Sequence, residues 1–139
     1  MISLSNVNKW YGTYHALADV DLQVTRGEVV VVCGPSGSGK STLIRTINRL
    51  EDIQSGTITV DGQDAHAPGR DVDRFRAGIG FVFQQFNLFP HLTVLENCTL
   101  APVHLRRLDK AAARQRALQL LERVGLAHKA GALPSQLAG

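Results

Sequence analysis

The chain has 139 residues, 44% of them hydrophobic, and a formal net charge of +3. This length and composition predict one globular domain and exclude a disordered, fibrous or low-complexity chain. No apolar run approaches the roughly 20 residues that span a bilayer, and the N-terminus lacks the features of a secretory signal. The two cysteines, Cys33 and Cys98, have no metal-like spacing, so we expect buried free thiols in a reducing cytoplasm.

Alternating hydrophobic side chains predict two strands in residues 1–25, joined by a turn at Gly12. The hydrophobic positions are Ile2, Leu4 and Val7, then Val20, Leu22 and Val24. A third strand is predicted in residues 28–33. Its run of five apolar residues, Val29–Cys33, indicates a strand covered on both faces, as in the parallel sheet of an α/β fold.

The middle of the chain alternates between predicted helix and strand. After a Gly/Ser-rich loop, apolar residues recur at helical spacing between residues 43 and 50. Thr57–Val60, followed by Asp61 and Gly62, predicts a strand that enters a tight turn. Residues 79–83 predict a further strand, because the large apolar residues Ile79, Phe81 and Phe83 recur at every second position.

From Leu92 onward the pattern is helical. Asp109 is placed to cap a helix from Lys110 to Val124, and Gly125 is a natural residue to end it. Residues 104–139 carry seven basic and two acidic side chains, a pattern that can indicate nucleic acid or anionic lipid. No aromatic residues interleave with these charges, so we expect a solvated helix face and no nucleic-acid partner.

One motif carries specific chemistry. The fixed positions of G-x-x-x-x-G-K-[ST] are all present in the loop between the predicted strand of residues 28–33 and the helix after it. The loop and its next residue are Gly34, Pro35, Ser36, Gly37, Ser38, Gly39, Lys40, Ser41 and Thr42. Glycines let backbone N–H groups approach phosphates, and the helix N-terminus adds positive potential. Lys40 would reach the β- and γ-phosphates, Ser41 would bind Mg²⁺, and Thr42 would lie near the α-phosphate. The chain is therefore predicted to bind a nucleoside triphosphate.

Hydrolysis would require further groups, above all an Asp at the end of a second strand that holds Mg²⁺. The only apolar strand that ends in Asp is Thr57–Asp61, and Gly62 favours a hairpin turn there. Three functions stay open: an ATPase subunit, a nucleotide-binding module without hydrolysis, and a small phosphate-loop kinase. A small kinase usually begins with its phosphate-loop strand, so the strand residues that precede it here argue against a kinase. The sequence contains no Asn-Lys-x-Asp base reader, which argues against a GTPase.

Four stretches together carry a family resemblance: Lys9–Gly12, the phosphate loop with its continuation to Glu51, Ser55–Gly62, and Phe81–Asn97. Their order and spacing resemble the ATP-binding subunits of ABC transporters, most closely those of polar amino-acid importers of the glutamate/aspartate type. The resemblance covers the whole chain. It implies an α/β phosphate-loop NTPase core with an N-terminal antiparallel β subdomain and the start of a helical subdomain.

The resemblance also implies roles for single residues. Tyr11 would stack on adenine, and Gln84 would contact Mg²⁺ and the attacking water. The Gln84–His91 loop would receive the transmembrane permease. The alternatives are a core position for Tyr11, a strand-capping role for Gln84, and internal packing for the apolar residues of the loop.

In this reading, residues 1–91 form the β subdomain and part of the core, and residues 92–139 form part of the helical subdomain. Leu137, Ala138 and Gly139 match the start of the family's Leu-Ser-Gly-Gly-Gln signature, with Ala where Ser is usual. The family places its Walker B aspartate, catalytic glutamate and switch histidine after this point. We therefore expect an incomplete ATPase domain that is inactive alone.

The resemblance also implies partners and a location. The partners are permease subunits and a second ATP-binding subunit, with which the protein would form a homodimer. It would lie at the cytoplasmic face of the inner membrane, with membrane contact only through the permease.

Overall fold

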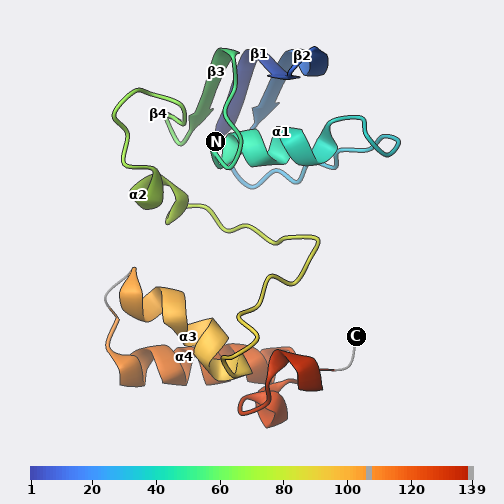
Figure 1. The fold of residues 1–139 in the computed structure, drawn as a ribbon. Coiled ribbons are helices and arrows are strands. Elements are labelled where there is room, and N and C mark those ends of the chain that lie inside the picture. The colour runs from blue at the N-terminus through green and yellow to red at the C-terminus, as the bar shows by residue number, and fades with distance from the viewer. Residues whose placement is uncertain (106–107, 138–139) are drawn as a thin grey trace. The chain divides into compact units, whose positions relative to one another are not determined.

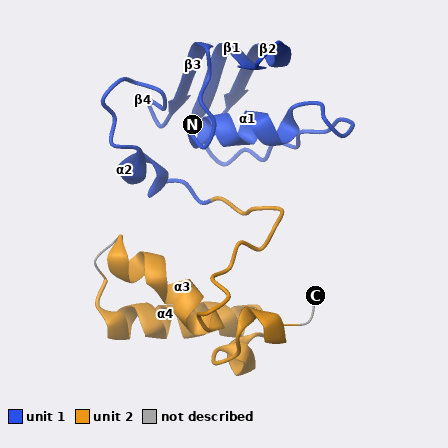
Figure 2. Ribbon diagram, in the orientation of Figure 1, with its two compact units in different colours: residues 1–80 blue, residues 81–139 orange. Residues whose placement is uncertain are grey.

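A computed structural model describes residues 1–105 and 108–137 (Figure 1). Ala138 and Gly139, on which part of the signature prediction depends, lie outside the described residues. The chain divides into two compact units, residues 1–80 and residues 81–139 (Figure 2).

The first unit is built on an antiparallel sheet with the strand order β2-β1-β3-β4. Its strands are β1 (Ile2–Tyr11), β2 (Tyr14–Val24), β3 (Ser55–Val60) and β4 (Gln63–Asp64). The β1–β2 turn contains Gly12, as predicted. Asp61 and Gly62 connect β3 to β4, so the hairpin interpretation of this segment is confirmed.

A buried asparagine holds β1 and β2 together where their pairing is irregular. The register shifts between Leu4 and Val7 and again toward Trp10. The Asn8 side chain accepts a hydrogen bond from the Asp19 backbone N–H (3.0 Å) and donates to the Asp19 carboxylate (3.0 Å). It thereby satisfies polar groups that the broken ladder leaves unpaired.

Helix α1 (Lys40–Ile47) lies across one face of this sheet (Figure 1). The apolar core lies between them and consists of Leu4, Val7, Leu17, Leu43, Ile58, Ala65 and Phe75. Phe75 comes from the short helix α2 (Val72–Arg76). At the other end of α1, His66 Nε2 lies 2.8 Å from the Thr46 carbonyl oxygen, and Arg76 Nε donates to Asn48 O (3.2 Å). Donors at this end satisfy carbonyls that a helix leaves unpaired.

Two predicted strands do not form. Residues 28–33 are irregular, with Val29 88% and Val31 77% exposed, and residues 79–83 are irregular as well. A strand needs a neighbour that pairs with its N–H and C=O groups, and no described strand pairs with either segment. The apolar run Val29–Cys33 is therefore not the buried parallel strand that its pattern predicts. Cys33 and Cys98 are free thiols as predicted, but both are exposed.

The second unit is helical. Helices α3 (Val94–His104) and α4 (Lys110–Arg123) pack against each other and are followed by 3₁₀ turns η1 (Ala127–Lys129) and η2 (Pro134–Gln136). The predicted cap is confirmed, because the Asp109 carboxylate accepts from Ala111 N (3.0 Å). Gly125 ends α4 with φ +74°, as its position predicts. A capping box between Thr93 and Glu96 starts α3.

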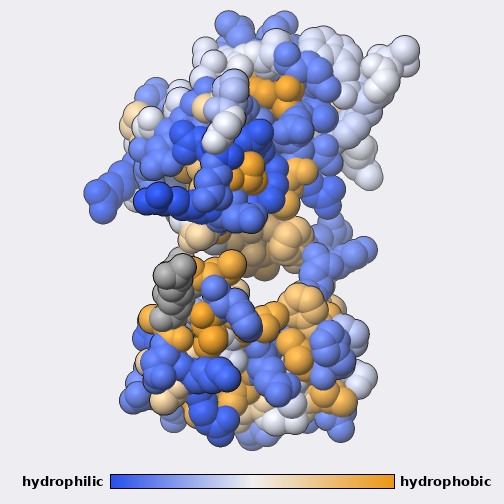
Figure 3. Space-filling view, turned by 60° about the vertical axis from the view of Figure 1, so that its left-hand side comes forward, coloured by the Kyte–Doolittle hydropathy of each residue, from blue (hydrophilic) through white to orange (hydrophobic). Residues whose placement is uncertain are grey.

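Hydrophobic side chains remain on the surface of the helical unit, which carries many of the orange patches in Figure 3. In α4, Ala117 and Leu121 are buried, whereas Leu120 and the following Val124 are exposed. Only part of the predicted apolar face is therefore covered. Among the described residues, no helix combines the length and hydrophobicity that crossing a membrane requires.

Candidate phosphate-binding site

The phosphate loop is pressed against β2. Gly39, the N-cap of α1, has a left-handed backbone with φ +88°. A Cβ added there would lie 2.7 Å from the carbonyl oxygen of Ala16 on β2, so a larger residue would clash with backbone. In the part of the chain that the structure describes, no side chain caps α1. The first backbone N–H groups of α1 therefore lack intrahelical acceptors and face the loop, an arrangement that suits an anion.

Lys40 folds back over the loop from the first position of α1. Its Nζ donates hydrogen bonds to Gly34 O (2.7 Å), Pro35 O (2.6 Å) and Ser38 Oγ (3.3 Å). The ammonium group is thus held inside the curve of the loop. Phosphate oxygens are stronger acceptors for a charged donor than these neutral oxygens, so a bound phosphate would compete for the same N–H groups.

Tyr11 lies beside the start of α1. Its hydroxyl oxygen is 3.5 Å from Thr42 Oγ1, and Lys9 Nζ is 4.8 Å from the centre of its ring. The side chain is 42% exposed, so Tyr11 is not a core residue. The structure brings Tyr11, Lys40 and Thr42 to one region of the first unit. Stacking of Tyr11 on adenine stays a prediction.

Tyr14 also contacts the phosphate loop, and no sequence motif identifies it. It pairs with Tyr11 across the β1–β2 turn, and its hydroxyl donates to the Gly37 carbonyl oxygen at 3.0 Å. This hydrogen bond ties the tip of the hairpin to the middle of the loop. The only signal in the sequence is a second tyrosine three residues after the first.

We expect Tyr14→Phe to weaken ATP binding by a few-fold, because a hydrogen bond of this kind is worth about 1 kcal/mol. Titration calorimetry of the two purified chains with MgATP would measure the change. Tyr14→Phe retains the ring and removes only the hydroxyl, so an unchanged affinity would show that this hydrogen bond does not order the loop.

Gln84 belongs to the second unit and Ser41 to the first, so their joint binding of Mg²⁺ stays a prediction. In the loop that follows Gln84, Phe86 is 85% exposed and Phe89 49%. Asn97 on α3 holds this loop: its Oδ1 accepts from Phe89 N (2.9 Å) and its Nδ2 donates to Phe89 O (3.2 Å). Asn97, like Tyr14, was not predicted as a site residue. It is the last residue of the Phe81–Asn97 stretch that carries part of the family resemblance.

Comparison with known proteins identifies the family. A family model described as "ABC transporter" matches residues 17–139. The chain belongs to the ABC transporter family. It is 55% identical over 139 residues to the glutamate transport ATP-binding protein GluA of Corynebacterium glutamicum and 56% identical over 139 residues to the glutamate/aspartate import ATP-binding protein GltL of Escherichia coli K12. The resemblance inferred from the sequence is therefore confirmed.

The chain spans only part of these ABC relatives. All of it aligns with GluA and GltL, but it covers 57% of the first and 58% of the second. A solved dimeric ATP-binding cassette in a post-hydrolysis state, bound to ADP and Pi, is similar with a TM-score of 0.90 and 37% identity. That match covers 99% of this chain and 63% of the cassette. The likeness confirms the predicted fold class, that of a phosphate-loop ABC ATPase.

Proposed function

We propose that this ABC chain is the ATP-binding component of an importer for polar amino acids, of the glutamate/aspartate kind. The observation that carries the proposal is the convergence of Lys40, the uncapped start of α1 and Tyr11 around one loop. Lys40 and the backbone N–H groups of residues 34–42 would hold the phosphates. Tyr11 would stack on the adenine. The substrate class rests on the printed functions of GluA and GltL.

The two side chains assigned to Mg²⁺ have the ligand chemistry that this ion requires. The Ser41 hydroxyl and the Gln84 amide oxygen are hard oxygen ligands of the kind that Mg²⁺ prefers. When bound, the ion would neutralise negative charge on the β- and γ-phosphates. Ser41 is exposed in the first turn of α1, directly after Lys40, where it is free to contribute its oxygen.

The assembled importer would use two further surfaces. The Gln84–His91 loop would dock on the transmembrane permease, because its apolar side chains at Phe86 and Phe89 are exposed while Asn97 fixes its end. A second ATP-binding subunit would complete the nucleotide site, as the dimeric state of the similar cassette suggests. The protein would then be peripheral at the cytoplasmic face of the inner membrane, held there by the permease.

Tyr11→Ala tests the nucleotide assignment. We expect it to weaken ATP binding about tenfold or more, because stacking of a base on an aromatic ring contributes about 1–3 kcal/mol. Binding of inorganic tripolyphosphate should change little, since that ligand has no base. Titration calorimetry with both ligands measures the difference.

The matched control is Tyr11→Phe, which keeps the ring and loses only the 3.5 Å contact with Thr42. It should bind ATP nearly as the unmodified chain does. Equal weakening of ATP and tripolyphosphate in Tyr11→Ala would show that Tyr11 supports the loop and does not contact adenine.

A further inference from the structure

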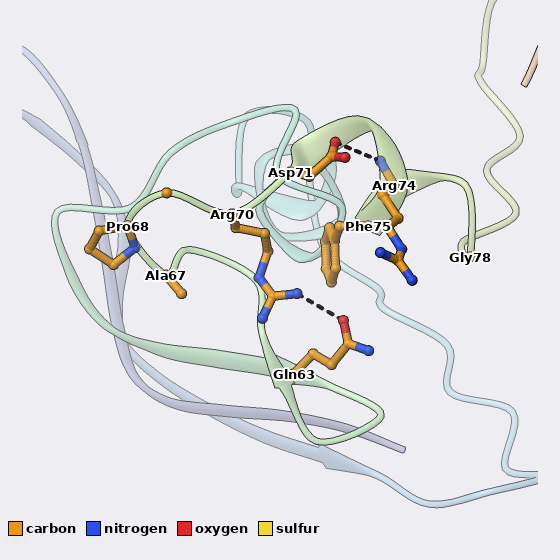
Figure 4. Close-up of a pocket in the computed structure, with 9 residues that line it drawn as sticks. Gln63, Ala67, Pro68, Arg70, Asp71, Arg74, Phe75 and Gly78 are labelled. Carbon is orange, nitrogen blue, oxygen red and sulfur yellow. Dashed lines mark hydrogen bonds between the residues drawn. The ribbon is translucent and has the colours of Figure 1, made fainter.

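We propose that a second anion site lies in the first unit, between the β3–β4 hairpin and α2, and that it binds a small oxyanion. A cavity of about 530 Å³ opens there (Figure 4). It is lined by Gln63, by the loop of residues 67–70, and by Asp71, Arg74, Phe75 and Gly78. None of these residues belongs to the phosphate loop, so this inference does not depend on the proposed function.

Arg70 lies in this cavity and has no counter-ion among the described residues. Its Nη1 donates to Gln63 Oε1 at 2.8 Å, and its guanidinium carbon lies 5.6 Å from the centre of the Phe75 ring. The side chain is half-buried, and its buried Nε has no hydrogen-bond acceptor among the described residues. Within the same residues Arg70 forms no ion pair. A partly desolvated cation without a counter-ion is unfavourable, and an anion in the cavity would relieve this.

A second guanidinium lines the same cavity. In Figure 4, Arg70 lies on the Gln63 side of the Phe75 ring, and the Arg74 side chain extends on the Gly78 side. The one acidic side chain in the lining, Asp71, accepts a hydrogen bond from Arg74 N (3.1 Å) as the cap of α2. The lining therefore keeps a net positive charge of one, and the carboxylate is already engaged with backbone.

These features favour a particular ligand chemistry. Guanidinium groups present planar, forked donors that match the oxygen pairs of carboxylates and phosphates. The Phe75 ring restricts the Arg70 guanidinium, so less side-chain freedom is lost when a ligand binds. The cavity volume lies in the range of small-molecule sites. The ligand class is a small oxyanion, either a carboxylate or a phosphate compound.

The test is titration calorimetry of the full chain with two probes, sodium succinate and inorganic phosphate, at low ionic strength. Inorganic phosphate should also occupy the phosphate loop, so both titrations are repeated on Lys40→Ala. We expect at least one probe to bind Lys40→Ala. Adding Arg70→Gln to that variant should weaken binding tenfold or more, and adding Arg74→Gln several-fold.

The matched control is Arg45→Gln, which removes one positive charge from an exposed position on α1 in the same unit. It should leave the affinity for either probe within twofold. Arg74 is exposed, so its variant should fold even if Arg70→Gln does not. Binding of succinate alone would identify a carboxylate site, and binding of phosphate alone a phosphate site. The inference is overturned if neither probe binds Lys40→Ala, or if Arg74→Gln and Arg45→Gln have equal effects.

Discussion

Gly56→Ala should unfold most of the first unit. Gly56 lies in β3 with φ +92°, and an added Cβ would clash with the Asn6 carbonyl group and lie 2.7 Å from Ser5 O. All of these are backbone atoms of β1, which cannot rotate away as a side chain would. We expect a loss of about 4 kcal/mol or more in the free energy of unfolding, against about 5–15 kcal/mol for an intact domain. Urea unfolding followed by circular dichroism measures the loss.

Gly62→Ala is the matched control for this prediction. Gly62 also has a left-handed backbone, φ +75°, but an added Cβ would meet no atom within 4 Å. Its substitution therefore isolates backbone strain, about 1–2 kcal/mol. If both variants lose the same amount of stability, β1 does not approach β3 at Gly56 as closely as the structure shows.

Steady-state hydrolysis of ATP by the 139-residue chain should be absent. Hydrolysis requires a carboxylate that holds Mg²⁺ and a residue that orients the attacking water. In the one candidate segment, Thr57–Asp61, the strand β3 ends at Val60. Asp61 lies in the β3–β4 turn and pairs with the Met1 ammonium group. Loss of such groups lowers rates by several powers of ten. Phosphate release from MgATP would be measured against Lys40→Ala as the background.

The environment of Asp61 supports its assignment to the turn. The hydrogen bond and charge of the Met1 ammonium hold the pKa of Asp61 below its ordinary value. This carboxylate is thus paired beside the first residue of β1, whereas the phosphate loop contacts Tyr14 at the β1–β2 turn, the other end of that strand. Sustained turnover that Lys40→Ala abolishes would show that another residue of the chain supplies the carboxylate that hydrolysis requires.

Short-range patterns in the sequence predicted most of the elements. The β1–β2 hairpin, the β3–β4 turn, the Asp109 cap and the end of α4 at Gly125 all follow from neighbouring residues. Residues 28–33 are different: their apolar run predicts a buried strand, but a strand forms only where another strand pairs with it. The sequence pattern of a segment does not show whether another strand is available to pair with it.

The contacts of the candidate site divide in the same way, into those that a sequence motif indicates and those that depend on tertiary packing. The phosphate loop follows from its motif, because its glycines let backbone N–H groups approach phosphates and its lysine, at a fixed spacing, reaches them. The contact from Tyr14 to Gly37 depends on how the β1–β2 hairpin lies against the loop, and the Arg70 cavity depends on how α2 packs on the sheet. Both are tertiary features of residues with no motif, so no periodicity or spacing indicates them.

Calorimetric titration of the purified chain with MgATP, repeated on Lys40→Ala, tests the central claim that this loop binds nucleotide. Lys40 Nζ already occupies the loop through three hydrogen bonds, and hydrogen bonds to charged groups contribute about 1.5–3 kcal/mol each. We predict that ATP binds and that Lys40→Ala weakens binding by roughly tenfold to a hundredfold, while circular dichroism shows both chains equally folded. Equal affinity of the two folded chains for ATP, or no binding by either, would contradict the claim.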